Sequence, residues 1–115
     1  FDEIIEDISK WGKILMIKIT PSFVIEIKDF MPTGTYGHGY YNFNTKGSSI
    51  SGHLKASDIE KIVFSSKVHR GMLSHSVSFN DINGEHIFKV FVTRNENREI
   101  IKDQFDKFIA LRDSF

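Results

Sequence analysis

The stretch ILMIKITPSFVIEIKD, residues 14–29, decides the fold class of this chain. Apolar side chains recur at every second position in both of its halves, as Leu15, Ile17 and Ile19 and then as Phe23, Ile25 and Ile27. A period of two is typical of a strand with one buried face. Thr20-Pro21-Ser22 separates the two halves and predicts a turn, so the stretch is expected to form an antiparallel hairpin.

The segment that follows, MPTGTYGHGYYNFN at residues 31–44, combines three tyrosines, one histidine and three glycines. It predicts a flexible loop that leads into a strand from His38 to Asn44, with His38, Tyr40 and Asn42 on one face. The next short strand, ISGHL, places His53 beside Gly52. Glycine inside a strand often marks the close approach of a ligand or of another backbone. The segment is therefore a candidate binding surface, and the alternative is a bulged strand with an aromatic core layer.

Three later stretches alternate in the same way and predict strands: IEKIVFSS at 59–66, SHSVSFN at 74–80 and HIFKVFVT at 86–93. Asn83-Gly84 predicts a tight turn between the last two. The isoleucines of residues 1–11 recur at helical spacing behind early acidic residues, which predicts a short helix. A second helix is predicted at the C-terminal end, where Thr93 and Glu96 have capping-box spacing and Phe105 and Phe108 lie on one stripe.

These elements predict one α+β domain over residues 1–115, with a single antiparallel sheet of about seven strands and a helix at each end. Fifteen basic and fifteen acidic residues leave no basic excess, which argues against a nucleic-acid partner. The apolar runs are much shorter than the roughly twenty residues of a membrane span, so no membrane insertion is expected. The absence of cysteine excludes disulfides and thiolate chemistry and fits a reducing cytoplasm.

Catalytic motifs are absent from the sequence. The five histidines show neither the HExxH motif nor the HxxxH spacing of a helical zinc site, and there is no GxSxG. Gly34, Gly37 and Gly39 precede a predicted strand rather than a helix, which does not favour a dinucleotide loop. The sequence thus gives no support to zinc, serine-hydrolase or dinucleotide chemistry.

Four blocks of sequence stand in one order: PTGTYGHGYYNF, SGHL, HRGMLSHSVSFND and GEHIFKVFVTRNENREI. In order and spacing they closely resemble the family of cytosolic haem-utilisation carriers that includes HutX, ChuX and HuvX. The resemblance runs from Trp11-Gly12 to about Arg112, which is most of the chain. Several blocks in one order are more specific than any single motif.

The resemblance implies a fold related to one half of the larger HemS/ChuS-type haem proteins, and a homodimer. It implies a cytoplasmic protein of a bacterial iron-acquisition system that takes up imported haem and transfers it, with a haem-accepting enzyme as a further partner. On this resemblance the protein is expected to be a haem carrier and not an enzyme. Two alternatives stay open: a haem-degrading enzyme of the HemS/ChuS type, and a homologue that has lost haem binding. The resemblance also implies that the family's N-terminal helical region is shortened or missing here.

Haem iron accepts histidine or tyrosine as an axial ligand, and the haem propionates favour cationic partners. The candidates for binding haem are His53, His38, Tyr40, Tyr36, His75 and Arg70. His53 is the first candidate for the iron ligand, because it matches the histidine of the family's SGH motif. Two positions depart from the family: Ile19, where some members carry a histidine, and His69-Arg70, where Phe-Met is common.

Overall fold

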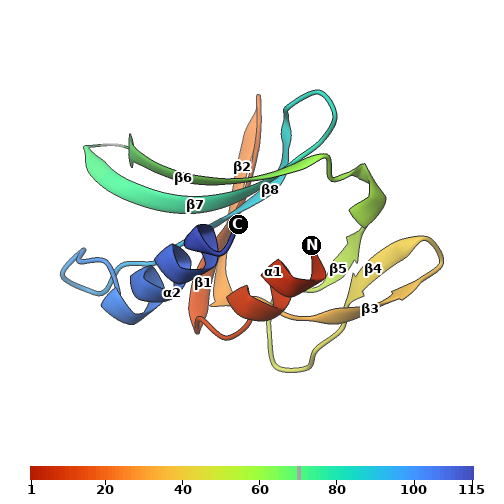
Figure 1. The fold of residues 1–115 in the computed structure, drawn as a ribbon, viewed down its shortest axis with the longest axis horizontal. Coiled ribbons are helices and arrows are strands. Elements are labelled where there is room, and N and C mark those ends of the chain that lie inside the picture. The colour runs from red at the N-terminus through yellow and green to blue at the C-terminus, as the bar shows by residue number, and fades with distance from the viewer. Residues whose placement is uncertain (70) are drawn as a thin grey trace.

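The computed structural model describes residues 1–69 and 71–115, and it contains two helices and two antiparallel sheets (Figure 1). The elements are α1 (Asp2–Ile8), β1 (Lys13–Thr20), β2 (Phe23–Phe30), β3 (Gly34–Gly37), β4 (Tyr40–Phe43), β5 (Gly52–Leu54), a 3-10 turn η1 (Ala56–Asp58), β6 (Lys61–His69), β7 (Met72–Asn80), β8 (His86–Phe91) and α2 (Lys102–Asp113). The large sheet has the order β2-β1-β8-β7-β6 and the small sheet the order β3-β4-β5. The predicted α+β class is confirmed, and the predicted single sheet is corrected to two.

The predicted hairpin over residues 14–29 is confirmed as β1 and β2, whose pairing begins with Lys13 opposite Phe30 and ends with Thr20 opposite Phe23. The predicted buried face is wrong, because Ile19, Phe23 and Ile25 are 40%, 62% and 42% exposed, β2 is an edge strand, and the fully buried side chain of β1 is Ile14. The chain leaves the large sheet directly after β2, where Met31 and Pro32 are buried. Proline has no backbone N–H to continue the ladder, so the strand ends and a second sheet begins.

The small sheet begins with a β-hairpin that the sequence pattern does not predict. Gly37 pairs with Tyr40, and His38 and Gly39 between them have φ values of 55° and 83°. Two successive residues with positive φ make the mirror-image two-residue turn that matches the twist of a hairpin. The prediction of a flexible loop and of a strand beginning at His38 is therefore wrong, since residues 34–37 are a strand and His38 lies in the turn.

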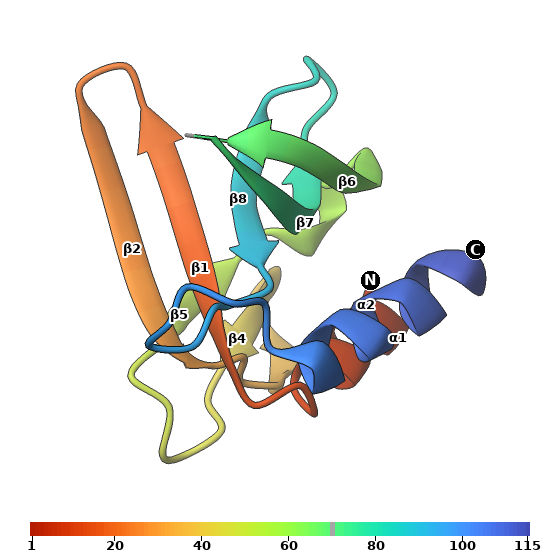
Figure 2. The same ribbon diagram turned by 90° about the vertical axis from the view of Figure 1, so that its left-hand side faces the viewer.

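Figure 1 shows β1 and β2 standing nearly upright while β6 and β7 run across them, as expected for a strongly twisted sheet. Figure 2 shows both helices on the same side of this sheet. The side chains of Ile14, Val77, Phe79 and Val90 are fully buried there. The same core continues into the small sheet through Phe1, whose ring lies 5.2 Å from Tyr41 and 5.8 Å from Phe79.

α2 begins at Lys102, so the predicted capping box of Thr93 and Glu96 is wrong. Thr93 is buried, and its backbone N–H donates to Gln104 Oε1 at 2.9 Å. Gln104 Nε2 donates in turn to the carbonyl oxygen of Lys13 at 2.6 Å. One side chain of the last helix thus ties the end of β8 to the beginning of β1.

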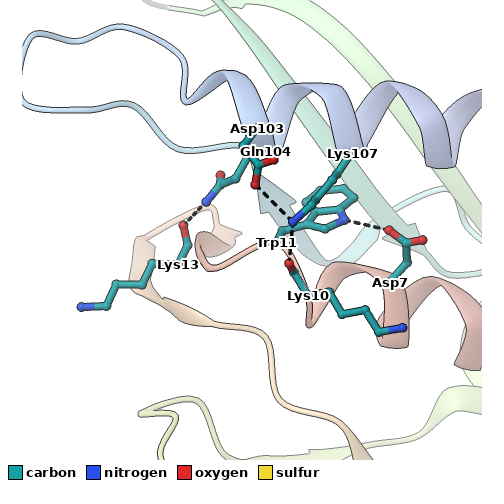
Figure 3. A network of polar contacts seen from close by, with 7 residues as sticks. All are labelled: Asp7, Lys10, Trp11, Lys13, Asp103, Gln104 and Lys107. Atoms are coloured by element: carbon teal, nitrogen blue, oxygen red, sulfur yellow. Dashed lines mark hydrogen bonds and ion pairs between the residues drawn. The ribbon is translucent and has the colours of Figure 1, made fainter.

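Figure 3 shows how α2 is also fixed to the corner between α1 and β1. Lys107 Nζ donates to the carbonyl oxygen of Lys10 at 3.0 Å and lies 3.1 Å from Asp103. Trp11 Nε1 donates to Asp7 at 2.8 Å, and the indole is buried. Neither described helix has the length and apolar character that crossing a membrane would need.

Candidate functional site

The outward face of the small sheet carries His53 and Tyr40, two of the predicted haem-binding residues. Asn42 lies opposite Thr35 on one side and opposite His53 on the other. Tyr40 stands two residues before Asn42 on β4 and shares its face. The rings of Tyr40 and His53 meet edge to face with centroids 6.3 Å apart, and both side chains are exposed. Two residue types that bind haem iron therefore stand together on an accessible surface.

Asn42 is the residue of this face that is not among the predicted haem-binding residues. Its Oδ1 lies 2.6 Å from His53 Nδ1, and its Nδ2 lies 3.1 Å from the carbonyl oxygen of Thr35. Close approach of β3 to β4 depends on Gly34, because a Cβ there would lie 1.8 Å from the carbonyl oxygen of Asn42. Close approach of two backbones therefore occurs at Gly34, whereas a Cβ at Gly39 or at Gly52, the glycine beside His53, would meet no atom within 4 Å.

Tyr36 lies on the opposite face of β3, where its ring packs 5.1 Å from that of Tyr41. Its hydroxyl donates to Asp2 of α1 at 2.5 Å. This hydrogen bond, with a smaller contribution from burial, raises the pKa of Tyr36 to about 12. The phenol is therefore harder to deprotonate than that of an ordinary tyrosine, which disfavours phenolate ligation of iron in this conformation.

His38 is exposed at the tip of the β3–β4 hairpin. The prediction that it shares a strand face with Tyr40 and Asn42 is wrong, because the two-residue turn takes it out of the strand. Its side chain is accessible, so it remains a surface candidate that is separate from the row of Thr35, Asn42 and His53.

His75 stands on β7 at the inner face of the large sheet and is only 6% exposed. Its ring lies 4.6 Å from that of Phe105 and 5.5 Å from that of Phe108. Nδ1 is 2.7 Å from Ser66 Oγ on the neighbouring strand. Burial, and then the positive charges of Arg94 and Arg112, hold the pKa of His75 below its ordinary value. The structure thus places His75 in the core beneath α2.

Arg70 and Ile19 are the remaining positions that the sequence analysis names. Arg70 lies outside the described residues. Ile19 is exposed near the end of β1, and its backbone N–H donates to His86 Nε2 at 3.1 Å. Burial, followed by the charges of Lys18 and Lys89, lowers the pKa of His86. The structure therefore gives His86 the role of a backbone acceptor.

An apolar hollow of 430 Å³ opens between the beginning of α1 and β6, with Phe1, Ile4, Ile62 and Phe64 in its walls. Its lining contains neither histidine nor tyrosine, so it offers no ordinary haem ligand. Among residues 1–69 and 71–115, no three histidine or acidic side chains stand close enough to hold a bare metal ion. The potential iron ligands and the apolar hollow are thus different surfaces.

The family model for haem utilisation ChuX/HutX matches residues 1–111. The chain belongs to this family. The sequence is 33% identical over 109 residues to the intracellular heme transport protein HutX of Vibrio cholerae, in a match that covers 95% of this chain and 56% of HutX. The chain therefore spans little more than half the length of that relative.

Several solved structures have the same fold as this chain. A protein of Agrobacterium tumefaciens is 40% identical and superposes with a TM-score of 0.94, covering 100% of this chain and 66% of that one. The heme binding protein ChuX is 27% identical with a TM-score of 0.90, covering 99% and 71%. The heme degrading enzyme ChuS of Escherichia coli O157:H7 is 14% identical with a TM-score of 0.74, over 94% of this chain and 32% of ChuS. At that identity the likeness to ChuS shows the fold alone, and this shared fold is the one that the resemblance in the sequence predicts.

Proposed function

We propose that this chain binds haem and transfers it within a bacterial haem-uptake system in the cytoplasm. The observation that carries the proposal is the family match over residues 1–111, which includes His53 of the SGH block. The similarity to proteins named for heme transport and heme binding supports the same function. The haem would be handed to an acceptor such as a haem-degrading enzyme.

His53 is the proposed axial ligand, with Tyr40 beside it as an aromatic neighbour. The surroundings of Tyr36 and His75 make these two residues weaker candidates for the ligand than His53. The hydrogen bond to Asp2 makes Tyr36 harder to deprotonate, and His75 is enclosed by Phe105 and Phe108. A single imidazole on an open sheet face suits a carrier, because the bound haem stays accessible to an acceptor.

Transfer without turnover is the proposed activity, so the chain is not an enzyme under this proposal. The named transport role of HutX supports it, whereas the likeness to ChuS extends to the fold alone. Incubation of the haem complex with an electron donor and catalase should leave the haem intact. Catalase-resistant conversion of haem to an open tetrapyrrole would contradict the proposal.

A homodimer is the proposed assembly. β2 is an edge strand of the large sheet, and Phe23, Val24 and Ile25 on it are 62%, 51% and 42% exposed. An exposed apolar edge of this kind can pair with a second chain. Light scattering should give twice the chain mass of 13.3 kDa. A mass of one chain at high concentration would contradict the proposal.

A haemin titration tests the proposed function directly. The Soret band should change saturably, close to one haem per chain, and the His53→Ala variant should have a shifted band and faster transfer to apomyoglobin. His75→Gln is the control, because its site lies in the core. No saturable change with the wild-type protein would contradict haem binding. An unaltered spectrum of the His53→Ala variant would contradict the assignment of the ligand.

A further inference from the structure

The Asn42 side chain contacts four groups on the outward face of the small sheet. Its Oδ1 lies 2.6 Å from His53 Nδ1. Its Nδ2 faces three backbone carbonyl oxygens, those of Thr35 at 3.1 Å, Gly37 at 3.3 Å and Tyr40 at 3.4 Å. The amide is thus placed between the histidine ring and the backbone of the β3–β4 hairpin.

These contacts fix which end of the amide faces the histidine. A carbonyl oxygen only accepts hydrogen bonds, so the three carbonyls require the NH₂ group of Asn42 on their side. With the amide turned over, Oδ1 would face three other acceptors with no hydrogen atom between them. The hydrogen-bond network therefore assigns Oδ1 to His53.

The orientation of the amide in turn fixes the tautomer of His53. Because Asn42 Oδ1 can only accept, His53 Nδ1 must carry the hydrogen. In a neutral imidazole the lone pair then lies on Nε2. Among the described residues no hydrogen bond engages this atom, and the His53 side chain is exposed. The lone pair of His53 Nε2 is therefore available to bind a metal ion.

We propose that Asn42 is the positioning residue of the haem site: it holds His53 in the tautomer whose Nε2 binds the iron. Hydrogen bonds to the second ring nitrogen orient metal-bound histidines and increase their basicity. The inference rests on the proposed function for the identity of the iron ligand. The tautomer itself is a property of the chain without haem and can be measured independently.

Asn44, the residue directly after β4, supplies a matched control. Its Nδ2 donates to Thr35 Oγ1 at 3.0 Å, and it has no hydrogen bond to a histidine. Asn44→Ala thus removes an asparagine contact to the same residue of β3 without touching His53. Asn42→Asp separates the two contacts of Asn42, because the carboxylate keeps the acceptor for His53 and replaces the donor to the hairpin carbonyls with an acceptor. Its backbone shifts must therefore show that the hairpin is intact, as for Asn42→Ala.

The first experiment is ¹⁵N NMR of the histidine side chains in the haem-free protein, at a pH where His53 is neutral. The wild type, Asn44→Ala and Asn42→Asp should show the Nδ1–H tautomer of His53, and Asn42→Ala should show a mixture. A wild-type His53 that carries its hydrogen on Nε2 would overturn the inference. An unchanged tautomer of His53 in Asn42→Ala would also overturn it, provided that the backbone chemical shifts of this variant show an intact hairpin.

The second experiment measures haem affinity in the same four proteins and in His53→Ala. Asn42→Ala should bind haem about 10-fold to 100-fold more weakly, whereas Asn42→Asp and Asn44→Ala should stay close to the wild type. Equal losses in Asn42→Ala and Asn42→Asp would overturn the inference, since hairpin support would then explain both. If His53→Ala alone leaves the affinity unchanged, the ligand assignment fails and the positioning role fails with it. Complete absence of haem binding by the wild type would instead refute the proposed function, while the NMR result would still decide the tautomer.

Discussion

The two sheets each carry a histidine whose Nδ1 is bonded to a polar side chain on the neighbouring strand. In the small sheet His53 meets Asn42 at 2.6 Å, and in the large sheet His75 meets Ser66 at 2.7 Å. The first ring is exposed, and the second is enclosed by the rings of Phe105 and Phe108. A similar cross-strand hydrogen bond therefore occurs in an exposed candidate ligand and in a buried core residue. The packing around the second ring nitrogen decides whether the histidine can reach a ligand.

The partners of the two histidines also differ in what they can do. The amide oxygen of Asn42 is an acceptor and imposes one tautomer on His53, whereas the hydroxyl of Ser66 can donate or accept. His75 is thus free to adopt either tautomer in its apolar surroundings. We infer that the large sheet supplies stability and that the small sheet supplies the ligand surface, and the following predictions test this division.

The largest expected effect is on the large-sheet side. Phe108 is fully buried, and its ring lies 5.5 Å from His75, 5.9 Å from Phe64 and 6.3 Å from Trp11. Phe108→Ala should lower the free energy of unfolding by about 3–5 kcal/mol, because it leaves a cavity in the core. Urea denaturation measures this loss.

The matched control for Phe108 is Tyr40→Ala on the small sheet, where 43% of the side chain is exposed. Surface changes of this kind usually alter stability by no more than about 0.5 kcal/mol. If Tyr40→Ala lowered the free energy of unfolding as much as Phe108→Ala does, the proposal that the large sheet supplies stability and the small sheet the ligand surface would be contradicted.

The sequence predicts those features that depend on residues close together in the chain, and it misses those that depend on contacts between distant residues. The alternation around Thr20-Pro21-Ser22 is local, so it predicts the first hairpin. Which face of that hairpin is buried depends on elements far along the chain, so the alternation does not predict it. The His38-Gly39 turn is missed because the tyrosines on both sides continue the pattern of a strand. The contact of Asn42 with His53 joins residues 11 apart across a loop, and only the strand register brings them together.

Thr93 and Glu96 illustrate the opposite error. Their spacing fits a capping box, yet Asn95 Oδ1 accepts the backbone N–H groups of Asn97 and Glu99 and forms a turn instead. Thr93 is then free to bond Gln104, which comes from the following helix. A local motif was thus overridden by a competing side-chain turn and by a long-range contact.

The second prediction concerns pH. The pKa of His75 is lowered from its ordinary value of 6.5, so the folded chain binds fewer protons than the unfolded chain. The stability due to neutral His75 is present above pH 6.5 and is lost as the pH falls from there through the folded pKa. One such proton contributes at most about 1.4 kcal/mol per pH unit to the slope of stability.

His75→Gln should therefore flatten the acid side of the stability profile, measured by urea denaturation between pH 7 and pH 5. Some slope should remain, because the pKa of His86 is also lowered by burial and by Lys18 and Lys89. An unchanged slope in His75→Gln would show that the ring already titrates in the folded state as it does in the unfolded one.

The third prediction compares the two hydrogen-bond partners. Ser66→Ala should cost about 1 kcal/mol of unfolding free energy, since it removes the bond to a buried ring. It should leave haem binding unchanged, in contrast to Asn42→Ala. Ser65→Ala, on the opposite face of β6, is the control and should have a smaller effect. A changed haem spectrum in Ser66→Ala would connect the large sheet to the ligand site.

The smallest expected effect tests the role of His38 in the turn. Its φ of 55° is unfavourable for most residues, and asparagine followed by glycine is the preferred pair in a turn of this type. His38→Asn should therefore raise the free energy of unfolding by about 0.5 kcal/mol, whereas Gly39→Ala should lower it by about 1 kcal/mol. The Soret spectrum of the His38→Asn haem complex should match the wild type, because the proposed ligand stands on β5. Loss of that spectrum with the turn intact would move the iron ligand from the sheet face to the hairpin tip, and His53 would then be a polar surface residue like Thr35, the other cross-strand partner of Asn42.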